Sequence, residues 1–116
     1  MIIKLDERNG IKIAPFASLS RFTLAVTEEV KNELKPVLSN PGTKLIFNLE
    51  NIDLIDSSGI GCIISLVKTA KSNDSGIKIC NLSREVASVF ELLHLQMILE
   101  IGKDVESCMA SFKEGN

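Results

Sequence analysis

The chemistry-bearing residues of this sequence gather in the stretch LIDSSGIGCII, where an acid, two hydroxyls and two glycines interrupt an apolar run. Asp56 is predicted to be the N-cap of a helix, because its carboxylate can accept hydrogen bonds from the amides of Ser58 and Gly59, which have no partner inside the helix. Asparagine caps nearly as well, so Asp56→Asn is expected to be mild. Ser57 and Ser58 then fall in the first turn, with their hydroxyls near the surface.

Three kinds of chemistry can be compared with this stretch. A phosphate-binding loop needs GxxxxGK followed by Ser or Thr, and the chain has no such motif. A serine hydrolase elbow needs GxSxG with a histidine and an acid, whereas the first glycine is missing and the lone His94 is expected to be an ordinary helix-end residue. A hydrolase nucleophile at Ser58 or Cys62 also lacks a base spaced to activate it. A serine that accepts a phosphoryl group from a partner kinase needs only exposure, and this interpretation fits best.

The same residues also have a structural interpretation, since Asp-Ser-Ser-Gly is a common way to begin a helix. One cap is enough for that purpose. Capping explains neither the second serine nor Gly59 and Gly61, which cost helix stability. The glycines are therefore expected to let another backbone approach, and Gly59 to leave room for a kinase at the Ser58 hydroxyl.

The elements around this stretch alternate between strands and helices. Asn9-Gly10 predicts a two-residue hairpin turn, and the run KLIFNL predicts a central strand covered on both faces. Strands are predicted at residues 1–5, 10–14, 44–49, 77–81 and 97–101. Right-handed crossovers would make most of this sheet parallel. The prediction is an α/β protein, a single domain over residues 1–116 with a mixed, mostly parallel sheet of about five strands and about four helices.

Four amphipathic stripes predict the helices. The first runs over residues 20–38, where Pro36 is expected to kink or end it. The second follows Asp56, the third is capped by Ser83, and the fourth closes the chain. The stripes consist of Phe22, Val26, Val30, Leu34 and Val37; Ile60, Ile63, Ile64 and Val67; Val86, Val89, Phe90 and Leu93; and Val105, Cys108, Met109 and Phe112. The serines fall in a loop leading into a helix, where functional sites of open sheets are favoured.

Composition argues against several functions. The chain has 13 basic and 15 acidic residues without a basic run, so direct binding of nucleic acid is not expected. No apolar run approaches the roughly 20 residues of a membrane span, and the N-terminus does not resemble a signal peptide, so a cytoplasmic location without membrane insertion is expected. Cys62, Cys80 and Cys108 fit neither a disulfide framework nor a zinc pattern and are expected to be buried thiols. No cofactor and no metal are expected.

The segment over residues 48–95, with its DSSG motif, resembles the signature half of a STAS domain, as found in bacterial anti-sigma factor antagonists. The resemblance runs from Lys44 to about Phe112 and covers roughly the first 40 residues only in outline. It implies a binding protein that is not an enzyme. Its unphosphorylated form would sequester an anti-sigma factor with serine kinase activity and free a sigma factor for transcription. The implied phosphorylation site is Ser58, and a serine phosphatase would reverse the modification.

The resemblance also assigns roles to the neighbours of Ser58. It implies a phosphoacceptor loop and partner-binding surface made of Asp56, Ser57, Gly59, Ile60 and Gly61. The chain departs from the family at Ala14-Pro15-Phe16-Ala17, where many antagonists carry a Gly-Glu-Leu-Asp-like turn that contributes to the partner surface. This departure keeps an alternative open, in which the chain is a STAS subunit of another assembly, such as a lipid-transport ATPase complex or a stressosome-like scaffold.

Overall fold

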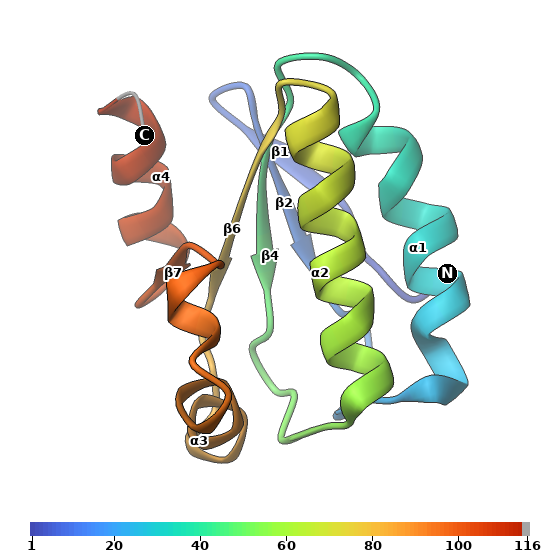
Figure 1. Cartoon of the computed structure of the whole chain (residues 1–116). Coiled ribbons are helices and arrows are strands. Elements are labelled where there is room, and N and C mark those ends of the chain that lie inside the picture. The colour runs from blue at the N-terminus through green and yellow to red at the C-terminus, as the bar shows by residue number, and fades with distance from the viewer. Residues whose placement is uncertain (115–116) are drawn as a thin grey trace.

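Figure 1 shows the computed structural model, which describes residues 1–114 and has a β-sheet with helices on both faces. Within these residues the main sheet has five strands in the order β1-β2-β4-β6-β7. The strands are β1 (Asp6–Arg8), β2 (Ile11–Pro15), β4 (Lys44–Asn48), β6 (Gly76–Cys80) and β7 (Ile101–Gly102). β1 is antiparallel to β2, and the other neighbouring pairs are parallel. The predicted mixed, mostly parallel sheet is confirmed.

Four α-helices surround this sheet in the part of the chain that the structure describes. They are α1 (Leu24–Leu38), α2 (Ser57–Ser72), α3 (Arg84–Leu92) and α4 (Val105–Lys113). α1 and α2 run side by side over one face, α4 covers the other face, and α3 lies near the carboxyl ends of the strands (Figure 1). The buried residues accordingly form a larger cluster on the α1 and α2 side and a smaller cluster beneath α4.

The centre of the sheet and its N-terminal hairpin agree with prediction. Leu45, Ile46 and Phe47 of β4 are fully buried, because the two core clusters cover the two faces of this strand. Asn9 and Gly10 both have positive φ angles, 55° and 78°, which is the combination that a type I′ hairpin turn requires.

The first predicted strand is wrong in its position. β1 covers Asp6–Arg8, and upstream of it Ile3 forms an isolated bridge to Phe16. Around this bridge the Lys4 amide donates to the Pro15 carbonyl and the Ala17 amide donates to the Ile2 carbonyl. The ladder does not continue toward Met1, because the Ile2 amide donates instead to the Glu33 carboxylate of α1 at 2.8 Å.

The first helix begins at Leu24 rather than at residue 20. Arg21–Phe22 instead form the short strand β3, which pairs in parallel with β5 (Leu54–Ile55) in a separate two-stranded sheet. Phe22 therefore lies outside the helical stripe. It is fully buried, with its ring centroid 5.1 Å from that of Phe16 and 5.9 Å from that of Phe47.

Pro36 lies inside α1 and does not end it, because the helix continues to Leu38. Leu34 and Leu38 are fully buried and hold the last turn against the core. Tertiary packing of an apolar face thus outweighs the loss of one helical hydrogen bond at the proline.

The strand predicted over residues 97–101 is mostly absent. Leu95–Met97 form a 3-10 turn, η1, and the amides of Ile98 and Leu99 donate to the carbonyl of Leu95. Only Ile101, the last residue of the predicted strand, pairs with β6, together with Gly102, which follows it. A short apolar run does not by itself distinguish a strand from a helical turn. His94 lies just after α3 with a left-handed φ of 57°, so its predicted place at a helix end is confirmed.

The three remaining predicted helices are present, but some residues of their predicted apolar stripes are less buried than expected. The Ser83 hydroxyl caps α3 by accepting from the amide of Val86 at 3.1 Å.

The burial of the helices differs in part from the predicted stripes. The buried side of α2 includes Cys62, Ile63, Leu66 and Ala70, whereas the predicted Ile60, Ile64 and Val67 are half-buried. Leu93 follows α3 and is exposed, whereas Cys108, Met109 and Phe112 of α4 are buried as predicted, and Val105 is half-buried beside them.

Candidate functional site

The serine segment, which we define as residues 56–61, lies where β5 passes into α2 and beside the start of α1. Asp56 is the N-cap of α2, and its Oδ1 accepts a hydrogen bond from the amide of Gly59 at 2.9 Å. Its Oδ2 accepts a second hydrogen bond, at 3.2 Å, from the amide of Leu24, the first residue of α1. The predicted N-cap is confirmed, and the same carboxylate also joins the starts of two neighbouring helices.

These amides favour the ionised form of Asp56. The hydrogen bond from Gly59 has the largest effect and, together with the one from Leu24, holds the pKa of the Asp56 carboxyl below its usual range, against the opposing effect of partial desolvation. The N-termini of both helices add positive partial charge at this point. Asp56 is therefore a carboxylate at neutral pH, and it would repel a second negative group placed beside it.

Asp56→Asn should lower the thermal midpoint more than Asp104→Asn does. An asparagine side chain has one acceptor oxygen, and its NH₂ group would face one of the two donating backbone amides. One of the two hydrogen bonds that Asp56 accepts would therefore be lost. Asp104 is a suitable control because it caps α4 and both of its hydrogen bonds come from one residue of that helix, Ser107, whose amide lies at 2.8 Å. This expectation replaces the mild effect that capping alone predicts.

The effect of Asp56→Asn on the thermal midpoint should depend on pH. Because folding lowers the pKa of Asp56, its stabilising effect is present above the unfolded-state pKa of about 4 and is lost as pH falls through the lower folded-state pKa. The difference in thermal midpoint between wild type and Asp56→Asn should therefore narrow below about pH 4. A difference that stayed constant in acid would contradict a role for the carboxylate charge.

Ser57 and Ser58 are the first two residues of α2. Ser57 is exposed and Ser58 is half-buried, so both lie at the surface, as expected, and Ser57 is the more open of the two. A phosphate group on either hydroxyl would lie at the N-terminus of a helix of 16 residues, where unpaired amides favour negative charge.

Gly59 lets another backbone approach, as expected, but this backbone is that of β3 in the same chain, so the expectation that Gly59 leaves room for a partner kinase is wrong. Gly59 is buried, and a Cβ atom there would overlap the carbonyl oxygen of Phe22 in β3 and lie 2.8 Å from Cγ1 of Ile55 in β5. This glycine allows α2 to begin against the two-stranded sheet. Gly61 differs, because it is exposed and a Cβ atom there would have nothing within 4 Å.

Two exposed leucines that the sequence analysis missed flank the serine segment. Leu24 begins α1 with 72% of its surface exposed, and Leu54 in β5 is 46% exposed. The hydrogen bond from Leu24 to Asp56 and the pairing of β3 with β5 bring their chain segments together. Leu24 is not part of the apolar stripe of its helix, and this position could have identified it from the sequence as an exposed apolar residue. Exposed apolar side chains beside polar ones are typical of a protein contact surface.

The structure argues against catalysis by the neighbouring thiol. Cys62 is buried, and its Sγ lies 3.7 Å from the carbonyl oxygen of Thr27 in α1. Burial raises the pKa of the Cys62 thiol to about 11, so little nucleophilic thiolate is present at neutral pH. His94 lines a different hollow, beside Ser88 and Glu91 of α3.

Within residues 1–114, no three His, Cys, Asp or Glu side chains are grouped as metal ligands would be. None of the helices in the same range has the length and apolar character needed to cross a bilayer.

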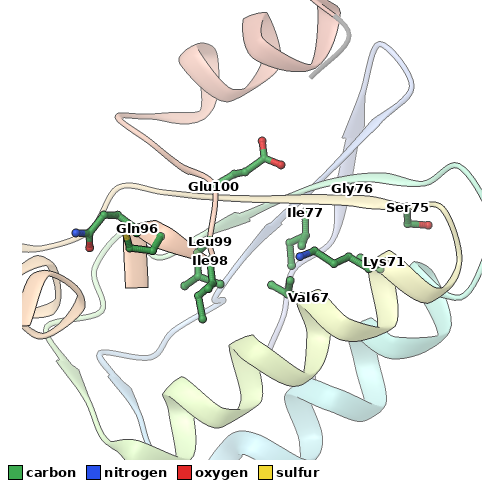
Figure 2. Close-up of a pocket in the computed structure, with 11 residues that line it drawn as sticks. Val67, Lys71, Ser75, Gly76, Ile77, Gln96, Ile98, Leu99 and Glu100 are labelled. Carbon is green, nitrogen blue, oxygen red and sulfur yellow. The ribbon is translucent and has the colours of Figure 1, made fainter. Parts of the chain in front are cut away.

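A cavity of about 290 Å³ lies beside the C-terminal half of α2, away from the serines at its start (Figure 2). It is lined by Val67 and Lys71 of α2, by Ile77 of β6 and by residues 96–100, among others. Figure 2 shows the Lys71 amine extending over apolar side chains, whereas the Glu100 carboxylate, which forms an ion pair with Lys78, points away. None of residues 56–61 lines this cavity, so it is separate from the serine segment.

Comparison with known proteins identifies the family. The model of the STAS domain family matches residues 3–108, which include the main sheet and the serine segment. The chain belongs to the STAS domain family. The match also covers the N-terminal hairpin, for which the sequence resemblance was only an outline, so β1 and β2 are part of the STAS domain.

Proteins similar to this chain in sequence or fold include regulators and a transporter. The anti-sigma-B factor antagonist of Staphylococcus aureus is 27% identical over 88 residues, which cover 76% of this chain and 79% of the relative. The structure of the anti-sigma factor antagonist SpoIIAA of Bacillus in its unphosphorylated form is 14% identical, covers 98% of this chain and 99% of SpoIIAA, and has a TM-score of 0.68. SpoIIAA has also been solved in its phosphorylated form.

The transporter is a murine anion transporter of the solute carrier class. It is 20% identical with a TM-score of 0.73, and the match covers 96% of this chain but only 19% of the transporter. The STAS fold thus occurs both as a separate regulator and as one part of a larger protein. Function must therefore be argued from the site rather than from the fold.

Proposed function

We propose that this chain is an anti-sigma factor antagonist whose partner binding is switched by phosphorylation of Ser58. The observation that carries the proposal is the capped DSSG start of α2, which presents two surface serines beside exposed leucines in a STAS domain. The unphosphorylated chain binds an anti-sigma factor that is also a serine kinase and so frees a sigma factor for transcription. A serine phosphatase restores the unphosphorylated chain. The chain itself acts by binding and catalyses no reaction.

The proposed contact surface is formed by residues at and beside the starts of α1 and α2. It consists of Leu24, Leu54, Ser57, Ser58, Ile60 and Gly61. The two leucines provide exposed apolar area, and the open space over Gly61 lets a partner backbone come close to α2. Asp56 and Gly59 belong to the same segment but act from within, because Asp56 joins the two helix starts and Gly59 packs against β3.

Phosphorylation would act on this surface by direct blockage. A phosphoserine brings about -1.5 to -2 charges and a bulky hydrated group to a site that previously held a small hydroxyl. The N-terminus of α2 favours the added charge, whereas the Asp56 carboxylate opposes it, so the two local effects partly cancel and little refolding of the domain is expected. A partner packed on Leu24 and Leu54 would therefore lose contacts with this surface.

Ser58→Ala should keep the fold and the partner complex but abolish phosphate uptake from the kinase and ATP. Ser58 is half-buried and alanine is slightly smaller than serine, so the melting temperature should change little. The test uses the anti-sigma factor kinase from the same genome that binds the unphosphorylated chain. Intact mass and peptide mapping after kinase treatment measure the number and position of phosphates.

Ser57→Ala is the matched control, since Ser57 is the neighbouring and more exposed hydroxyl. This variant should still take up one phosphate. Ser58→Asp should weaken the partner complex because it adds charge at the contact surface. A phosphate mapped to Ser57, or no phosphate on wild type from a kinase that demonstrably binds it, would refute the assignment of Ser58.

A second candidate function is a STAS subunit of another assembly, and the residues at the end of β2 support it. Ala14 and Phe16 are buried in the larger core cluster and only Ala17 of residues 14–17 is exposed, unlike the contact turn expected of many antagonists. Copurification of the chain under native conditions separates the two functions. Recovery of transporter or scaffold subunits instead of an anti-sigma factor would favour this second candidate.

A further inference from the structure

The face of the sheet beneath α4 carries a pair of thiols that the serine segment does not use. Cys80 of β6 and Cys108 of α4 are both buried in the smaller core cluster. Cys80 pairs with Gly102 in the register of β6 and β7. A Cβ atom at Gly102 would lie 2.5 Å from the Sγ atom of Cys108, so this glycine lets the Cys108 side chain approach the strand next to Cys80.

The two thiols are close enough to affect each other's ionisation, although each donates a hydrogen bond to another group. Sγ of Cys80 lies 3.9 Å from Oδ1 of Asn48, and Sγ of Cys108 lies 3.9 Å from the carbonyl oxygen of Ile79. The neighbouring Cys80 side chain holds the pKa of Cys108 below its usual range, with help from the Lys78 ammonium and against the effect of burial. The Cys108 side chain and burial raise the pKa of Cys80. The pair therefore loses its first proton from Cys108, and the second proton is held more tightly.

Cys108 also borders a small cavity of about 260 Å³, lined with Lys78, Glu100, Ser107 and Ser111 among others. The Lys78 amine is almost completely buried and donates to Oε2 of Glu100 at 2.8 Å and to Oγ of Ser111 at 2.7 Å. Cys108 itself is only 1% exposed, so a small oxidant would have to reach its sulfur through this polar cavity. A cation beside a thiolate of lowered pKa is the environment in which cysteines react.

The third cysteine, Cys62, has neither a lowered thiol pKa nor a place in the lining of this cavity. Cys62 lies on the other side of the sheet, on the face of α2 that packs against α1, and its Sγ contacts the carbonyl oxygen of Thr27. Burial raises the pKa of its thiol to about 11. Cys62 is therefore an internal control for a buried and unreactive thiol in the same molecule.

We propose that Cys80 and Cys108 are an oxidant-sensitive dithiol, which hydrogen peroxide converts into a disulfide that joins β6 to α4. The Cys108 thiolate attacks one peroxide oxygen, the O–O bond breaks, and the leaving hydroxide takes up a proton to become water. The Cys80 sulfur then attacks the Cys108 sulfenic acid, and a second water leaves as the S–S bond forms. Two thiols are oxidised and one peroxide is reduced to two waters.

The test is peroxide treatment of the full chain, followed by alkylation of the remaining thiols, trypsin digestion and mass spectrometry without reduction. Trypsin separates the three cysteines, because Cys62, Cys80 and Cys108 lie in the fragments 45–68, 79–84 and 104–113. We expect an intact mass lower by two hydrogen atoms before alkylation, a cross-link between fragments 79–84 and 104–113, and an alkylated Cys62. Dithiothreitol should restore all three free thiols.

Matched variants test the order of the two steps. Cys80→Ser should stop at the Cys108 sulfenic acid, which dimedone traps, and Cys62→Ser should form the cross-link like wild type. Oxidation of Cys62 as fast as Cys108, or wild type that stays folded with all thiols free under peroxide, would overturn the proposal. The result is independent of Ser58 phosphorylation, because α4 and α2 lie on opposite faces of the sheet (Figure 1).

Discussion

Phe112→Ala should lower the free energy of unfolding by about 3–5 kcal/mol. The Phe112 side chain is 4% exposed and fills the smaller core cluster between α4 and the sheet. An added Cβ atom at Gly76 would come within 3.0 Å of its ring, and the Lys78 amine lies 4.8 Å from the ring centroid. Truncation therefore removes transfer free energy and a cation–π contact and leaves a cavity in a tightly packed region.

Urea unfolding of wild type, Phe112→Ala and Lys113→Ala measures this effect. Lys113 is the exposed neighbour of Phe112 on the same helix, so its replacement should change the free energy of unfolding by no more than about 0.5 kcal/mol. Equal unfolding midpoints for wild type and Phe112→Ala would mean that α4 is not packed on the sheet as described.

Gly59→Ala and Gly61→Ala should change stability in opposite directions, although the two glycines are two residues apart on one helix. A methyl group at Gly59 would overlap the Phe22 carbonyl oxygen and crowd Ile55, so overpacking should cost about 1–3 kcal/mol. A methyl group at Gly61 meets nothing within 4 Å. Since alanine forms helices better than glycine does, Gly61→Ala should gain up to about 1 kcal/mol.

Thermal and urea unfolding of the two variants measure the stability difference, and binding to the anti-sigma factor adds a second reading. Gly61→Ala should weaken the complex although the free chain is more stable, because its methyl group enters the space proposed for the partner. If Gly59→Ala were as stable as wild type, the close approach of α2 to β3 would be wrong. If Gly61→Ala bound the partner as tightly as wild type, Gly61 would lie outside the contact surface.

Local sequence patterns determined the element types wherever one face of an element is buried. The spacing of Cys108, Met109 and Phe112 predicted which side of α4 meets the sheet, because a helical period carries the direction of the core in neighbouring residues. Asp56 and Ser83 were predicted as N-caps for a similar reason, since a capping side chain reaches an amide only three residues ahead. The Asn9-Gly10 turn likewise needs only the φ preferences of two residues.

Only the tertiary structure decided the features that depend on distant residues. The Leu24 amide reaches Asp56 across 32 positions of the chain, and the pairing of β3 with β5 rests on two residues in each strand, which is too short for a periodic pattern. Because of the same contacts, Gly59 packs against β3 and β5 instead of leaving space for a partner, and Leu24 lies on the surface. Cys80 and Cys108 meet because Gly102 of β7 lies between their elements. Such contacts follow from which elements pack together, and the period of a single helix or strand carries no information about its neighbour.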